Sequence, residues 1–154
     1  MELAVGNFLT FTAGTAVKQR FQNFFIGEVA SYQGTSFLFA PFGFSGVTVN
    51  RNGDNTEASL VFPNNSLTRA WAVEALENKW LAHVRVMLLN PDDKTDLTLM
   101  HEYYSQVATG KWGEATLELT LNTILDAVGS DVPRRRLTQK LIGAIPVTSG
   151  LRLQ

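Results

Sequence analysis

The chain has 154 residues, which is the size of one ordinary domain. Charged residues make up 18% of it, below the usual figure of about 25%, which indicates that other chains cover part of its surface. The net charge of −1 excludes the basic field of a general nucleic-acid binder. Because there is no cysteine, disulfides, thiolate metal sites and iron–sulfur clusters are excluded too.

No stretch approaches the about 20 apolar residues that cross a bilayer. The start of the chain, Met1-Glu2-Leu3, lacks the basic region of a signal peptide. We therefore expect no membrane partner and a chain that stays where it is translated.

Short apolar runs separated by Gly, Pro and Asn predict strands in the first part of the chain. The first runs are residues 3–11, 21–32 and 35–44. Pro41 interrupts the third run and, since proline cannot donate to a ladder, predicts an edge strand or a bend. Residues 47–49 and 57–62 flank Asn52-Gly53, a pair typical of a tight hairpin turn.

One helix is predicted, over residues 66–78, with Asn65 or Ser66 capping its first turn. Five of its residues fall near one face and are expected to be buried: Leu67, Ala70, Trp71, Ala75 and Leu76.

The second half of the chain is again expected to form strands. Residues 81–89 and 97–107 are predicted strands, and Thr109-Gly110-Lys111 is predicted to turn the chain. Residues 114–121 alternate between leucine or alanine and polar side chains, which is typical of a strand with one buried face.

Short strands with turn signals between them and one inserted helix predict a mainly β fold. We expect an antiparallel β-barrel, built from residues 1–131. The pattern weakens after Asp126, so residues 132–154 are predicted to be an extended C-terminal arm that packs on the barrel or on a neighbour.

Two histidines are the main candidates for site chemistry. His83 and His101 both lie in predicted strands, and Glu102 follows His101 directly. A zinc site needs three or four convergent ligands, so we predict no metal and no other cofactor. These three residues would form a catalytic site only if they converged in a cleft, and we expect the chain not to be an enzyme.

Two groups of side chains are better candidates for a partner interface. The 21–44 stretch holds seven phenylalanines, and neighbours such as Phe24 and Phe25 point to opposite sides of a strand. One of that pair is expected to face away from the barrel, and Phe42 and Phe44 are further candidates. Arg134, Arg135 and Arg136 form the single basic cluster, for which partner anchoring ranks above nucleic-acid binding and a solvated face is the simpler alternative.

Two segments carry a resemblance to a known family. Residues 62–71, Phe-Pro-Asn-Asn-Ser-Leu-Thr-Arg-Ala-Trp, resemble a strand-to-helix passage in small tail proteins of tailed bacteriophages. Residues 132–138, Val-Pro-Arg-Arg-Arg-Leu-Thr, are similar to a segment of the same proteins. The family is the minor tail or baseplate hub group that includes lambda-type minor tail protein L.

The resemblance implies a β-barrel hub domain that forms a ring at the tip of the tail tube, with tube proteins above it and spike or hub proteins below. Lambda-type members carry a C-terminal iron–sulfur region, which this chain cannot hold because it has no cysteine. The chain is also short, about the length of one hub domain. The resemblance therefore implies a reduced, barrel-only version or a different ring component of the same particle. In either case we expect a trimer or hexamer that is made in the bacterial cytoplasm and built into the virion tail.

Three functions are left open by the sequence. The first is this structural ring subunit, in which deleting residues 132–154 would leave a folded body that assembles poorly. The second is a barrel that binds a small ligand or carbohydrate in an aromatic cavity. The third is an enzyme that uses His83, His101 and Glu102.

Overall fold

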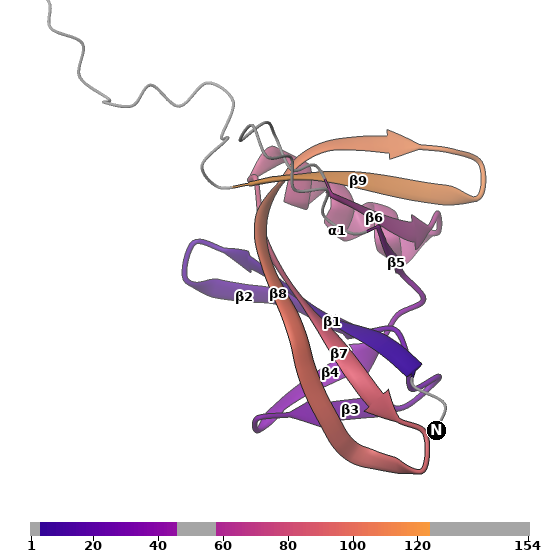
Figure 1. The fold of residues 1–154 in the computed structure, drawn as a ribbon. Helices are drawn as coiled ribbons and strands as arrows, with labels where there is room; N and C mark the ends of the chain where they lie inside the picture. The colour runs from indigo at the N-terminus through magenta and orange to yellow at the C-terminus, as the bar shows by residue number, and fades with distance from the viewer. Residues whose placement is uncertain (1–3, 46–57, 124–154) are drawn as a thin grey trace, which may run out of the picture.

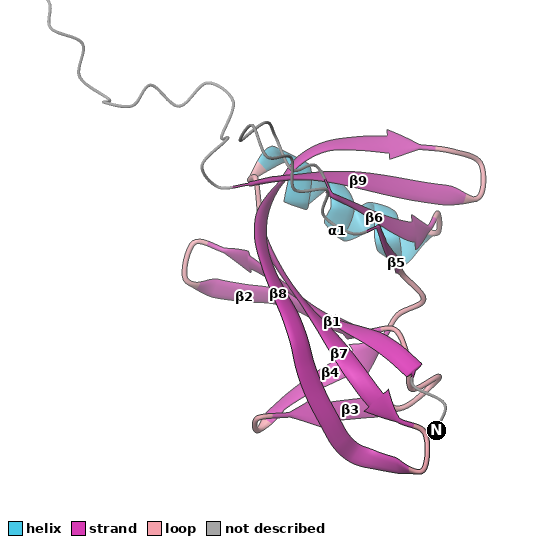
Figure 2. Ribbon diagram, in the orientation of Figure 1, coloured by secondary structure: helices cyan, strands magenta, loops and turns pink. Residues whose placement is uncertain are grey.

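The computed structural model describes residues 4–45 and 58–123, which form one sheet and one helix (Figures 1 and 2). The elements in chain order are β1 (Ala4–Ala13), β2 (Ala16–Gln22), β3 (Val29–Tyr32), β4 (Thr35–Phe39), β5 (Gly43–Ser45), β6 (Ala58–Pro63), α1 (Ser66–Glu77), β7 (Leu81–Asn90), β8 (Asp93–Trp112) and β9 (Thr116–Thr123). The predicted mainly β class with one helix is confirmed. The predicted hairpin at Asn52-Gly53 and the arm at 132–154 lie outside the described residues.

The predicted antiparallel barrel, closed or nearly closed, is not confirmed. The nine described strands form a sheet in the order β3-β4-β2-β1-β7-β8-β9-β6-β5, and the two end strands do not pair with each other. All pairings are antiparallel except β2 with β4. Figure 1 shows β5, β6, β9 and α1 at one end of the molecule and β3 and β4 at the other, with β8 running between them.

Two apolar cores lie on opposite faces of the central strands. Phe8 and Leu9 are neighbours on β1, so their side chains point to opposite faces, yet they are only 1% and 0% exposed. Leu9 lies opposite Val84 of β7 and belongs to what we call the large core. Phe8 lies on the face that also carries Met87 and belongs to the small core. At Phe8 and Leu9 both faces of β1 are therefore covered, each by a different part of the chain.

The large core is enclosed by the curled sheet and α1. Its buried residues are Leu9, Phe11, Phe42, Ala58, Leu60, Phe62, Ala72, Ala75, Trp80, Ala82, Val84, Tyr103, Val107, Leu117, Leu119 and Leu121. The three leucines of β9 are all fully buried, which confirms the alternation predicted for this strand. At the margin, the rings of Trp71 and Trp80 stack with centroids 6.4 Å apart.

The helix α1 has the predicted bounds within one residue. Asn65 is the N-cap, and its Oδ1 accepts a hydrogen bond of 2.8 Å from the Thr68 backbone N–H. The predicted buried face is partly wrong, because Leu67 is 78% exposed and Ala70 is also exposed. The face that meets the sheet is rotated toward Thr68, Ala72 and Ala75, residues small enough for α1 to lie close to the large core.

The small core is closed by β3, β4 and the turn before them. Its buried residues are Phe8, Ala30, Phe37, Met87 and Leu89. Residues 21–32 do not form the single strand predicted, because the fully buried Gln22 starts a turn there. Its Oε1 accepts from the N–H groups of Phe24 and Phe25 at 2.9 and 2.7 Å, and its Nε2 donates to the carbonyl of Phe25 at 2.8 Å. Hydrogen bonds of the Gln22 side chain thus replace the backbone hydrogen bonds that a continued strand would have made here.

The strand β8 is longer than predicted at both ends. It runs for 20 residues, through the predicted turn at Thr109-Gly110-Lys111, and the chain reverses after Trp112. The pairing of β8 with β9 continues on both sides of a register irregularity between Val107 and Thr109. A Cβ at Gly110 would meet Cδ1 of Leu76 at 2.7 Å, so this glycine serves close packing against the helix.

Candidate functional site

The four phenylalanines predicted as a partner interface lie in or beside the cores. Phe42 is 5% exposed and lies within the large core, where its ring centroid is 5.5 Å from that of Phe62. Phe44 is partly buried and packs against the large core. The rings of Phe24 and Phe25 contact each other with centroids 4.6 Å apart, and both pack against the small core. All four therefore contribute to folding of the single chain, and their role in binding a partner stays a prediction.

Arg134, Arg135 and Arg136 lie outside the described residues, so their anchoring role also stays a prediction.

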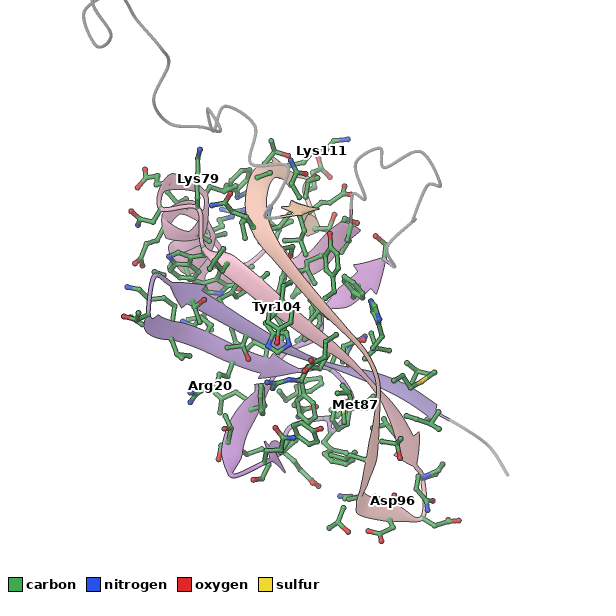
Figure 3. The ribbon with its side chains drawn as sticks, turned by 60° about the vertical axis from the view of Figure 1, so that its left-hand side comes forward. Arg20, Lys79, Met87, Asp96, Tyr104 and Lys111 are labelled. Carbon is green, nitrogen blue, oxygen red and sulfur yellow. The ribbon has the colours of Figure 1, made fainter. Side chains whose placement is uncertain are left out.

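The central strands carry a polar cluster on the same face as the small core. His83 and Arg85 of β7 lie opposite Tyr104 and Glu102 of β8. Arg85 Nε donates to Glu102 Oε1 at 3.1 Å. The ring of His83 stacks on Tyr104 with centroids 4.0 Å apart and an interplanar angle of 13°. Figure 3 shows Tyr104 in the middle of this face, with Met87 further along toward the hairpin tip.

The surroundings of His83 lower its pKa and so favour the neutral imidazole. Burial lowers its pKa below the ordinary value of 6.5, and the Arg85 guanidinium lowers it further, while Glu102 acts in the opposite direction. His83 Nε2 lies 3.3 Å from Glu102 Oε1 but makes no well-aligned hydrogen bond. The contact therefore becomes an ion pair only when His83 is protonated, and at neutral pH Arg85 is the charged partner of Glu102.

The third member of the catalytic alternative is not part of this cluster. His101 lies opposite Val86, so it points to the other face of the sheet from His83 and Glu102. Within residues 4–45 and 58–123, no three His, Asp or Glu side chains gather closely enough to hold a metal ion. The structure thus brings together two of the three candidates, and these two make a packed ion-pair cluster with Arg85.

A pocket lies beside the cluster. Its volume is about 230 Å³, and it is lined by Thr10, Thr12, Leu81, Ala82, His83, Tyr104 and Ser105. Ligand sites usually have volumes of about 300–1,000 Å³ and gather several aromatic side chains, whereas here Tyr104 already stacks on His83. The pocket does not favour the ligand-binding alternative, which stays a prediction.

Apolar side chains are exposed along the end of the molecule that α1 does not cover. Val5, Val29 and Leu38 are between 56% and 60% exposed, and all three lie on the face opposite the small core. Met100 is 59% exposed at the irregularity where β8 shifts register against β7. The alternation of residues 35–39 contained this signal, because a strand that places Phe37 and Phe39 on one face turns Leu38 to the other.

The single helix of the described residues, α1, is too short to span a membrane.

The fold is similar to that of a chain in a solved virion structure. A chain in the virion of a native gene transfer agent particle superposes with a TM-score of 0.55 at 13% sequence identity. The match covers 87% of this chain but only 44% of that one, so this chain spans less than half of its neighbour's length. No protein-family model and no curated protein matches the sequence. At this identity the likeness concerns the fold alone.

Proposed function

We propose that this chain is a structural subunit of a phage-like virion, and that it forms a ring at the tail tip or baseplate hub between the tail tube and the spike. The observation that carries the proposal is the fold shared with the gene transfer agent chain over 87% of this chain. The resemblance of residues 62–71 to phage tail proteins agrees with it. In the structure these residues form the junction of β6 with α1.

The exposed surface supports a role in assembly. Val5, Val29, Leu38 and Met100 are each more than half exposed, and apolar surface of this kind commonly contacts other proteins. The titratable groups offer less to an enzyme, since Glu102 is paired with Arg85 and the His83 ring is stacked on Tyr104.

The first test is the mass of the full chain in solution by light scattering over a range of concentrations. For a ring subunit we expect the measured mass to rise with concentration toward that of trimers, hexamers or larger species. Rings should then be visible by negative-stain electron microscopy. Substituting Arg134, Arg135 and Arg136 together by Ser is expected to lower the assembled fraction. Arg20→Ser, Lys79→Ser and Lys111→Ser together, all at exposed positions, serve as the control for the loss of three positive charges. A monodisperse monomer at every concentration contradicts self-assembly into a ring.

A further inference from the structure

The β3–β4 hairpin is joined to the rest of the sheet by a short ladder. Within the described residues this ladder has two residue pairs, Phe21 with Leu38 and Gln22 with Phe39, and it is the one parallel pairing of the sheet. Parallel pairs are slightly less stable than antiparallel ones, and segments held by few backbone bonds open more readily than the rest of a domain. Side chains that reach the hairpin from the central strands therefore have a large share in holding it closed.

The main contact of this kind comes from Arg85 of β7. Its Cζ lies 5.8 Å from the centre of the Tyr32 ring on β3, and that ring stacks on Phe8 with centroids 5.4 Å apart. A guanidinium over an aromatic ring is attracted to its face, more strongly when the pair is partly buried. The other charged contact, between Lys94 and Glu28, is more than half exposed on both sides and therefore contributes little.

Arg85 shares its carboxylate partner with His83. Nε of Arg85 and Nε2 of His83 lie 3.1 and 3.3 Å from the same oxygen, Oε1 of Glu102. A protonated His83 competes for that oxygen and places a second positive charge about 7 Å along the strand from Arg85. The His83 ring is held by its stack on Tyr104, so the longer Arg85 side chain is the one that moves.

The other charges around His83 do not cancel this effect. Among the described residues, five charged or titratable side chains lie on its face, on β7 and on the strands around it: Arg85, Glu102, Tyr104, Arg20 and Tyr32. Burial has the largest effect on the pKa of His83 and lowers it, Arg85 lowers it further, and Glu102 raises it. A proton therefore binds more readily once His83 is better hydrated and Arg85 has moved away.

We propose that protonation of His83 opens the β3–β4 hairpin locally, with Arg85 as the link, while the large core stays folded. The protonated imidazole takes Glu102 as its partner and repels Arg85, which leaves the Tyr32 ring. The coupling is reciprocal, because an open hairpin frees Arg85 and hydrates His83, so the open form binds the proton more tightly. One proton thus replaces a contact between β7 and the hairpin by a contact within the central strands.

The hairpin carries apolar surface whose position depends on this contact. Val29 and Leu38 are 59% and 56% exposed and lie opposite each other in its ladder. Opening moves both away from β2, because Leu38 is the residue that pairs with Phe21. Acid therefore alters this surface without unfolding the chain. The device acts within a single chain, so it is independent of the proposed ring.

The first test is hydrogen exchange of the full chain between pH 8 and 5, corrected for the intrinsic exchange rate at each pH. Because the pKa of His83 is lowered in the closed form, the closed form should lose stability as the pH falls below 6.5. Protection of β3 and β4 is expected to fall at least about threefold, while that of α1 and β9 stays within about twofold.

Two variants identify the group that takes up the proton. His83→Gln should abolish the fall in protection, whereas His101→Gln, on the opposite face, should keep it. Constant protection in the natural chain, an equal fall in every element, or a fall that persists in His83→Gln overturns the proposal.

The reciprocal measurement follows the titration of His83 by NMR, with the signal of His101, the second of the two histidines, as the internal reference. Gln22→Met removes the acceptor that holds the turn before the hairpin and is expected to raise the pKa of His83 toward 6.5. Tyr32→Leu removes the ring under the guanidinium and should act in the same direction. Gln19→Met on β2 is the control. If the pKa of His83 moves in neither Gln22→Met nor Tyr32→Leu, hairpin and histidine are not coupled and the proposal is wrong.

Discussion

The two cores lie on opposite faces of one sheet, and they are closed in different ways. The large core is covered by α1 and by three leucines of β9, which lies between β8 and β6 in the sheet. The small core is covered by a short hairpin and by a turn that depends on the side chain of one residue, Gln22. A core closed by many long-range apolar contacts is expected to unfold with the whole chain. A core closed by one polar anchor is expected to open locally.

The largest expected effect is in the large core. Leu119→Ala removes a fully buried side chain and is expected to cost about 2–5 kcal/mol of unfolding free energy. Denaturant titration followed by circular dichroism should show one transition at a lower midpoint. Glu118→Ala, on the opposite side of the same strand, is the control. If only part of the structure melted, the large core would not be the cooperative unit.

The next largest effect is expected in the small core, which should open while the large core stays folded. Gln22→Met keeps the size of the side chain but leaves the N–H groups of Phe24 and Phe25 without their acceptor, at a cost of about 3 kcal/mol. Hydrogen exchange is expected to accelerate in β3 and β4 while α1 and β9 stay protected. Gln19→Met on the same strand is the control. Equal acceleration throughout would mean that the two cores open together.

A smaller effect is expected at Gly6, where β1 packs against Phe24 in the turn that follows Gln22. A Cβ at Gly6 would clash with the Phe24 ring and lie 2.9 Å from Leu89 Cδ1. Gly6→Ala should therefore cost about 2 kcal/mol by overpacking the small core. Adding Phe24→Leu should recover part of the loss, which a double-mutant cycle measures. Independent, additive effects of the two substitutions would show that this contact is not the cause.

The smallest effect is a pH dependence of stability that comes from His83, on the face of the sheet that carries the small core. Because burial and Arg85 lower the pKa of His83, the folded state binds a proton less readily than the unfolded chain, whose histidine has the ordinary value of 6.5. The contribution of His83 to stability is complete above pH 6.5 and decreases as the pH falls, until His83 is protonated in the folded state too.

Melting temperatures between pH 5 and 8 measure this slope, which His83→Gln should flatten. His101→Gln is the control for the loss of a histidine on the opposite face. An unchanged slope in His83→Gln would show that His83 is not its source.

Local patterns were sufficient for several elements. The alternation of β9 predicted its buried face, and Asn65 followed by an apolar helical pattern predicted the start of α1. Both signals act within a few residues and do not depend on what lies across the fold. The histidine cluster was partly predicted, because strand alternation already places the neighbours His101 and Glu102 on opposite faces, whereas only the register of β7 with β8 brings Glu102 opposite Arg85 and near His83.

The sequence by itself determined the β class, the single helix and most strand positions, because hydrophobic period, capping residues and turn residues act locally. The tertiary structure decided which face each aromatic covers, why Gln22 is buried, and that β3 and β5, the end strands of the described sheet, do not pair with each other. These features depend on which strands pair and in what register, and residues far apart in the chain fix them together. The two neighbours Phe8 and Leu9 illustrate this, since their shared burial requires covering segments from different parts of the chain.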